Sequence, residues 1–199
     1  MSINLAPDVT WKGDDVFQTT SFNIPRPASG ISVGAFLQLG ISMSNAQTAD
    51  ITVAGWTSFG TPTEKKGYIF WKIADATDAS GSGNWVCTCD DGFIEQWAGQ
   101  GWNGVNTSTP FATGPAFNTV AAGSTTINFT SQTSPGTGSV WVGMTALENN
   151  SSGITVDPTS PAVRNITSDS GFMDDNLCVG YSATVNSGAY APSGTQGTA

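Results

Sequence analysis

The chain has 199 residues, of which 38% are hydrophobic and only 11% are charged, and its formal net charge is −9. This length accommodates one all-β domain with a sizeable core, and 24 glycines with 10 prolines indicate many turns rather than a helical bundle. The six Lys and Arg residues are too few and too scattered to neutralise phosphates, so we expect no nucleic-acid partner and no anionic membrane partner.

Residues 1–8 have neither the basic region nor the apolar region of a secretory signal peptide. No run approaches the roughly 18 apolar residues of a membrane span. We therefore expect the chain to be made and kept in a cytoplasm. Its low charge and its many Ser, Thr, Asn and Gly residues are nevertheless typical of proteins that work outside a cell, and a virus particle released by lysis would reconcile the two expectations.

Residues 1–16 are mostly polar, and we interpret them as an extended N-terminal arm that does not pack on its own. Residues 17–199 contain no repeat or linker and are expected to form one domain. Trp11 and Phe17 are then candidate partner contacts that would anchor the arm on a neighbouring subunit. The alternative is a frayed chain terminus.

The first expected strand, residues 17–24, alternates in polarity and is followed by Pro25. In residues 31–43, every odd position from Val33 to Met43 is apolar, which predicts a central strand with one face in the core. A short strand is expected at 51–53. It leads into two aromatic and β-branched runs, 55–59 and 67–76, which predict a β-hairpin because turn-forming residues separate them.

The second half of the chain is expected to continue as short strands. Gly99, Gly101 and Gly104 would each cost about 1 kcal/mol in a helix, which favours a strand ending in a glycine-rich loop. The expected strands lie at 85–89, 93–106, 125–130, 140–147 and 177–185, with a polar connection at 149–161 and a tail of small residues at 188–199. Seven to nine strands without a convincing helix predict a single jelly-roll-like β-sandwich.

Four segments give this order a resemblance to a family of β-sandwich proteins of bacteriophage virions, which extends well over residues 17–110. Residues 54–57 (Ala-Gly-Trp-Thr) and 70–76 (Phe-Trp-Lys-Ile-Ala-Asp-Ala) match two family motifs closely. Residues 33–39 correspond to the early apolar strand but lack its usual acidic residue, and residues 100–106 resemble a later turn.

The resemblance implies a non-enzymatic subunit of the virion, as a capsid decoration, a head fibre or a tail-associated protein. Such a subunit would bind the major capsid protein or other virion proteins, and further copies of itself. Capsid decoration is the first expectation, with the arm anchored on the capsid lattice. Family members close with a final apolar strand that this chain lacks, so we expect the arm or a neighbouring subunit to cover the open edge.

The seven tryptophans raise a second hypothesis, a carbohydrate-binding module that recognises a host glycan on a head fibre or tail. Trp97 and Trp102 are the candidate glycan contacts, because the glycines beside them indicate an exposed loop. Trp56, Trp71 and Trp85, together with Trp141, fall in expected strands, where large rings usually fill a core.

The residues that commonly carry chemistry are sparse. Histidine is absent, which excludes Ser-His and Cys-His nucleophile systems. A glycan-degrading enzyme with two carboxylates is the third hypothesis. The acidic clusters are Asp90, Asp91 and Glu95, and Asp174 with Asp175; we interpret them as solvated turns rather than calcium ligands, and expect no catalytic residue, metal or cofactor.

Three cysteines are too few for a disulfide framework, and Cys87 and Cys89 lie on one face of the same expected strand. We interpret all three as small buried residues in a reducing cytoplasm. A bridge from Cys178 to either of the other two stays open if their strands are adjacent.

Overall fold

The computed structural model describes the backbone of residues 7–15, 19–43, 49–60, 67–92, 95–108, 110–111, 126–128, 132–134, 141–147, 154–156, 163–169, 176–182, 188–190 and 193–196. The side chains that it describes lie within residues 7–111. Over these residues the structure consists of antiparallel sheets, and the one helix described is the single turn α1 (Ala76–Ala79). This confirms the predicted all-β sandwich.

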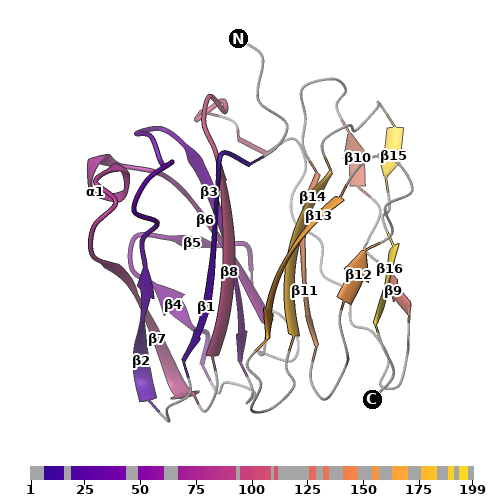
Figure 1. Ribbon diagram of the computed structural model, residues 1–199, viewed down its shortest axis with the longest axis horizontal. Helices are drawn as coiled ribbons and strands as arrows, with labels where there is room; N and C mark the ends of the chain where they lie inside the picture. Colours follow the sequence, from indigo (N-terminus) through magenta and orange to yellow (C-terminus); the bar gives the residue numbers. More distant parts are fainter. Residues whose placement is uncertain are drawn as a thin grey trace.

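Two sheets form the N-terminal half of the molecule (Figure 1). The first, which we call the outer sheet, has the order β2-β7-β4, and the second, the five-stranded sheet, has the order β1-β8-β3-β6-β5. Their strands are β1 (Val9–Asp15), β2 (Thr19–Pro25), β3 (Phe36–Met43), β4 (Thr52–Val53), β5 (Thr57–Ser58), β6 (Gly67–Ile73), β7 (Asn84–Gly92) and β8 (Glu95–Trp102).

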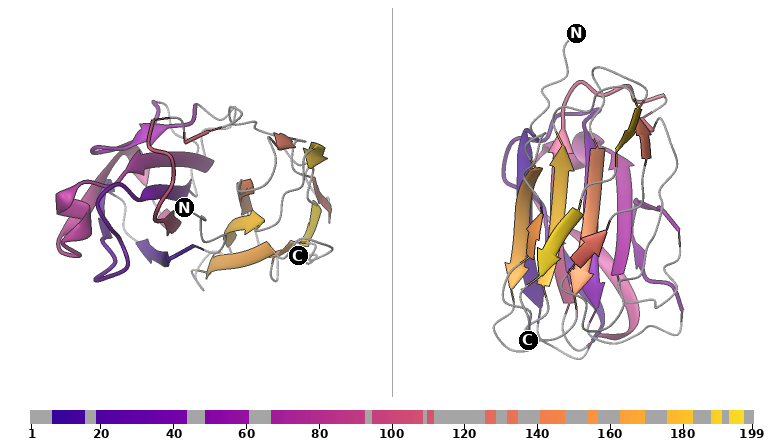
Figure 2. Two further views of the ribbon diagram at one scale, coloured as in Figure 1. Left: turned by 90° about the horizontal axis from the view of Figure 1, so that it is seen from above. Right: turned by 90° about the vertical axis from the view of Figure 1, so that its right-hand side faces the viewer.

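The C-terminal half adds a sheet of order β11-β14-β13, which lies against the second face of the five-stranded sheet (Figure 1). Figure 2 shows the two halves at opposite ends of the molecule when seen from above. The remaining strands form the sheets β12-β16-β9 and β10-β15. Their bounds are β9 (Thr126–Asn128), β10 (Gln132–Ser134), β11 (Trp141–Leu147), β12 (Ile154–Val156), β13 (Val163–Asp169), β14 (Asn176–Ser182), β15 (Gly188–Tyr190) and β16 (Ser193–Gln196).

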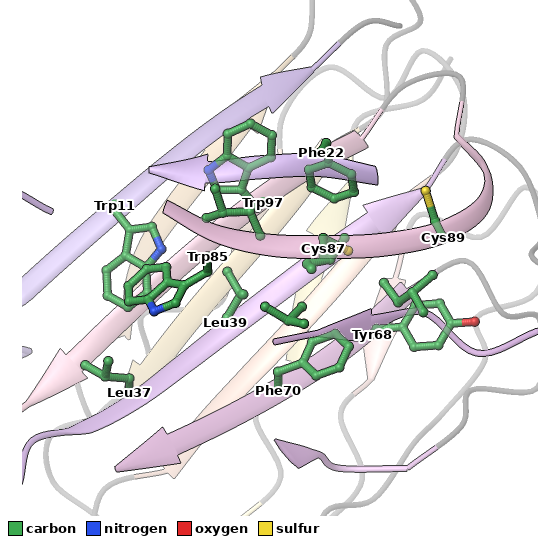
Figure 3. Close-up of a cluster of buried hydrophobic side chains, with 14 of the residues drawn as sticks. Trp11, Phe22, Leu37, Leu39, Tyr68, Phe70, Trp85, Cys87, Cys89 and Trp97 are labelled. Atoms are coloured by element: carbon green, nitrogen blue, oxygen red, sulfur yellow. The ribbon is translucent and has the colours of Figure 1, made fainter. Parts of the chain in front are cut away.

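The main hydrophobic core lies between the outer sheet and the five-stranded sheet (Figure 3). The outer sheet contributes alternate residues, because side chains of a strand point to opposite faces in turn. In β7 these are Trp85, Cys87 and Cys89. From the opposite sheet, Leu37 and Leu39 of β3 point into the same core.

The predicted hairpin is present, since β5 pairs with β6 in antiparallel register with Thr57 opposite Trp71. The prediction for β3 is confirmed at its odd positions, where Leu39 and Ile41 are completely buried. The even positions are buried as well, because the β11-β14-β13 sheet lies against the other side. Period-two patterning therefore identified one buried face of β3 and missed the second.

The N-terminal segment differs from the expected extended arm. Val9–Asp15 form β1, which pairs with β8 along seven residues from Val9 opposite Gly101 to Asp15 opposite Glu95. The polar composition of this segment concealed the strand, because only Val9 and Trp11 of its seven residues are large and apolar.

The C-terminal tail also differs from the expectation. β16 lies between β12 and β9 in its sheet, so this part of the tail is a central strand rather than an open edge. Within the described part of the expected arm, residues 9–15 pair with β8 and not with the sheet that contains β16. The strand forms by backbone hydrogen bonding with its neighbours. Ser and Gly can make these bonds as well as any residue, so no apolar pattern is needed.

Candidate functional site

The two motifs that carry the family resemblance meet at one end of the main core, around the side chain of Asp78. The 70–76 segment supplies Lys72 from β6 and Asp75 at the start of α1. The 54–57 segment supplies Gly55, where an added Cβ would lie 3.7 Å from Lys72 Nζ, and Trp56. We call Arg26, Lys72, Asp75, Asp78 and Trp85 the ion cluster.

Asp75 and Asp78 build the single turn of α1 reciprocally. Asp75 Oδ1 accepts hydrogen bonds from the backbone N–H groups of Thr77 and Asp78 at 2.8 and 3.0 Å, and Asp78 Oδ2 accepts from the Asp75 N–H at 3.0 Å. This is a capping box, which satisfies N–H groups that have no partner within the helix. The pKa of the Asp75 carboxyl is lowered, chiefly by the Asp78 N–H and further by the nearby Lys72.

Asp78 is completely buried, and both of its carboxylate oxygens have partners. Lys72 Nζ lies 2.6 Å from Oδ2, Arg26 Nε lies 3.4 Å from Oδ1, and Trp85 Nε1 donates to Oδ1 at 2.8 Å. A carboxylate removed from water is costly unless charges and hydrogen bonds compensate it, and here they do. Because Asp78 thereby joins β6, β7 and the end of β2 to α1, we interpret the cluster as structural.

The aromatic rings close this end of the core. The Trp56 and Trp85 rings make an edge-to-face contact with centroids 5.1 Å apart, and the Arg26 guanidinium lies 5.6 Å from the Trp85 ring centroid. Gly55 adopts φ +79°, a conformation that residues with side chains rarely take, so the Gly-Trp pair has a backbone requirement. Residues 54–57 therefore form a turn, and residues 70–76 supply the charged side chains of Lys72 and Asp75 beside it.

Trp11 belongs to the core rather than to an exposed arm. Its side chain is 9% exposed, and its ring lies 5.5 Å from that of Trp85. The ring crosses to the neighbouring strand over Gly99, where an added Cβ would collide with it. The prediction that Trp11 contacts a partner assumed that its ring is exposed on an arm, and the ring is buried. The second candidate, Phe17, lies outside the described residues.

Trp97 and Trp102 are strand residues of β8 and not residues of an exposed loop. They are 5% and 2% exposed, so neither ring is accessible for stacking on a sugar. Trp97 stacks on Phe22 in the main core, and Trp102 packs beside Phe36 on the opposite face of the sheet. The two candidate glycan contacts are therefore packing residues.

Of the predicted core tryptophans, Trp85 is buried, and Trp56 and Trp71 are partly buried against hydrophobic clusters. The backbone of Trp141 lies in β11, and its side chain is outside the described residues. Trp71 joins a second aromatic cluster with Phe36, Phe59 and Phe111. This cluster lies on the face of the five-stranded sheet that points away from the main core.

The carboxylates and thiols of the sequence analysis are distributed as follows. Asp90 Oδ2 accepts a hydrogen bond from the Ala49 N–H at 2.6 Å, whereas the side chains of the other clustered acids are outside the described residues. No metal-binding cluster of three or more ligands occurs within the described part of the chain. Cys87 and Cys89 are buried thiols of β7. Cys178 belongs to β14 in a different sheet, and the two strands are not adjacent.

Sequence reasoning missed two organising residues. Asp78 could have been found, because an acid three residues after Asp75 is a capping-box signal. Asn103 gave no signal: its N–H donates to Asp8 Oδ2 at 2.6 Å, its Oδ1 accepts from the Ser32 N–H at 3.2 Å and its Nδ2 donates to the Gly30 carbonyl at 3.3 Å. This residue fixes the 100–106 turn to two neighbouring segments.

Comparisons of the chain with protein-family models, with curated proteins and with solved structures gave no match. Among the described residues, no helix is long and apolar enough to span a membrane.

Proposed function

We propose that this protein is a structural subunit of a bacteriophage virion that decorates the capsid surface and acts by binding other virion proteins. The observation that carries the proposal is the position of the two resemblance motifs. Both converge on the ion cluster, where Gly55 sets the turn and Lys72 neutralises a buried acid. The segments that resemble the virion family therefore stabilise the fold, as expected for a family that is defined by its structure in the particle.

The contacts of Asp78 give it a role in packing and not the role of a general base. In the ion cluster, both oxygens of Asp78 are already engaged by Lys72, Arg26 and Trp85. A general base needs an oxygen within reach of a substrate proton, and a completely buried carboxylate offers none. The carbohydrate-binding alternative rested on Trp97 and Trp102, and the burial of both rings removes that support.

The proposal is tested on particles of the phage that encodes the chain. Deleting the gene should yield particles that lack one density on the capsid exterior in cryo-electron microscopy, and adding the purified protein back should restore it. Particles with an unchanged exterior after the deletion would overturn capsid decoration. If the missing density were at a tail tip, the virion role would stand and its location would be corrected.

A further inference from the structure

The amine of Lys72 and the carboxylate of Asp78 are in direct contact inside the molecule. Lys72 Nζ lies 2.6 Å from Asp78 Oδ2, and the two side chains are 10% and 0% exposed. An amine and a carboxyl group are the two halves of an amide, which forms when the amine nitrogen attacks the carboxyl carbon and water leaves. Burial holds the reacting groups together and keeps bulk water away from the product. The pair therefore has the composition and the contact that a side-chain amide bond requires.

The two oxygens of Asp78 have different surroundings. Oδ2 is the oxygen that contacts the Lys72 amine, and it also accepts the Asp75 N–H at 3.0 Å. Oδ1 has two other donors beside it, because Trp85 Nε1 donates to it at 2.8 Å and Arg26 Nε lies 3.4 Å away. The buried Nε of Arg26 makes no hydrogen bond within the described residues. Both donors are therefore placed to stabilise negative charge that develops on Oδ1 when the carboxyl carbon is attacked.

A second carboxylate, that of Asp75, lies on the other side of the amine. Its Oδ2 is 3.5 Å from Lys72 Nζ, and its side chain is 61% exposed. The pKa of Asp75 is lowered from 3.8, so this carboxylate is ionised at neutral pH and can accept a proton. A carboxylate in this position can take a proton from the amine and pass it to the leaving oxygen. Because Asp75 is exposed, this side of the pair also gives the released water a route to solvent.

We propose that Lys72 and Asp78 form an intramolecular isopeptide bond after the chain folds, with Asp75 as the proton relay. The Lys72 ammonium first transfers one proton to Oδ2 across the ion pair, which gives an amine and a carboxylic acid. Nζ then attacks Cγ, a second proton passes from Nζ through Asp75 to Oδ2, and the Cγ–Oδ2 bond breaks with release of water.

The reaction needs no other reactant, because one ammonium and one carboxylate become one amide and one water. The amide carbonyl oxygen is Oδ1, which keeps its hydrogen bond from Trp85. The bond forms once in each chain and joins β6 covalently to α1. This proposal does not depend on the proposed function.

The test is mass spectrometry of the full chain, purified in the folded state and kept at neutral pH. The protein is denatured, its free amines are acetylated, and chymotrypsin then cleaves after Trp71 and Trp85. The released peptide, residues 72–85, contains both reacting side chains. In the wild type it should be lighter than its sequence mass by one water molecule, and the Lys72 side chain should not be acetylated. A peptide of full mass with an acetylated Lys72 side chain would overturn the proposal, whether or not the protein is found in virions.

Three variants identify the reacting groups. Lys72→Arg keeps a cation beside Asp78 but removes the amine, so its peptide should show no loss of water. A loss that persists in this variant would come from a cyclised aspartate and would overturn the isopeptide bond. Lys12→Arg is the matched control, because Lys12 lies in β1 outside the ion cluster, and it should keep the full loss. Asp75→Asn should slow bond formation at least about tenfold, and an unchanged rate would overturn the role of Asp75 as the relay.

Discussion

The two faces of the five-stranded sheet are both buried along β3, but they are filled with different chemistry. The face toward the outer sheet is apolar, with Leu37, Leu39 and Ile41 in the main core. The opposite face carries the buried amides of Gln38 and Gln100, which form a 2.7 Å hydrogen bond across neighbouring strands. Apolar patterning therefore defines one buried layer of the sheet, whereas paired polar groups can complete a second layer without exposure to water.

The largest effect should come from the charged end of the main core. Asp78→Ala removes the buried carboxylate that pairs with Arg26 and Lys72, and leaves Lys72 only the 3.5 Å contact with Asp75. We expect a loss of about 3–5 kcal/mol in the free energy of unfolding. Urea unfolding of the variant and the wild type measures the difference. A loss below about 1 kcal/mol would show that the ion cluster does not stabilise the fold.

The next effect tests whether Trp11 belongs to the core. Trp11→Ala removes a ring that packs on Trp85 and over Gly99, and we expect destabilisation of about 3–5 kcal/mol, at the lower end because the ring lies near the surface. The measurement is again urea unfolding of the isolated protein. An anchor for a partner would instead leave the stability of the free protein nearly unchanged and reduce only its binding to particles.

The amide pair gives a smaller effect on the opposite face. Gln38→Leu deprives Gln100 Nε2 of its acceptor, which should cost about 1–3 kcal/mol. The double variant Gln38→Leu/Gln100→Leu should be less destabilised than the sum of the two single variants, because both polar partners are then removed together. Simple additivity in a double-mutant cycle would show that the two side chains are not coupled.

The smallest effect concerns the exposed cap of α1. Asp75→Ala should cost about 1 kcal/mol at neutral pH through loss of the N-cap. Because the pKa of Asp75 is lowered from 3.8 in the folded state, its carboxylate contributes stability above pH 3.8 that is lost as the pH falls through the folded value. Asp75→Asn retains a capping oxygen but not the charge, so it should lose this acid dependence and be destabilised less than Asp75→Ala at neutral pH. An unchanged acid dependence in that variant would contradict the assignment.

Much of the fold was predictable where side chains alternate. β3 and the β5–β6 hairpin follow directly from apolar and aromatic spacing, and Cys87 and Cys89 were correctly expected to be buried. β1 and β16 were not predictable in this way, because their residues are mostly small or polar and their order comes from pairing with neighbours.

The sequence identifies the two motifs of the candidate site but does not predict that they lie together in the fold. The Gly55-Trp56 and Lys72–Asp75 motifs were recognised, but their meeting around Asp78 depends on the antiparallel packing of distant strands. The glycines beside Trp97 indicate an exposed loop in the sequence, but they lie in the strand β8 and the turn after it. In the structure, Gly99 lies under the Trp11 ring and Gly13 under the Trp97 ring, so these glycines make room for aromatic packing across β1 and β8.

The most direct test of the central claim is the copy number of this protein in purified virions, measured by quantitative mass spectrometry against the major capsid protein. We predict a fixed ratio to the capsid protein that persists through density-gradient purification, because a decorating subunit occupies equivalent positions on a lattice. Absence of the protein from purified virions, together with its abundance in the infected-cell lysate, would contradict the claim.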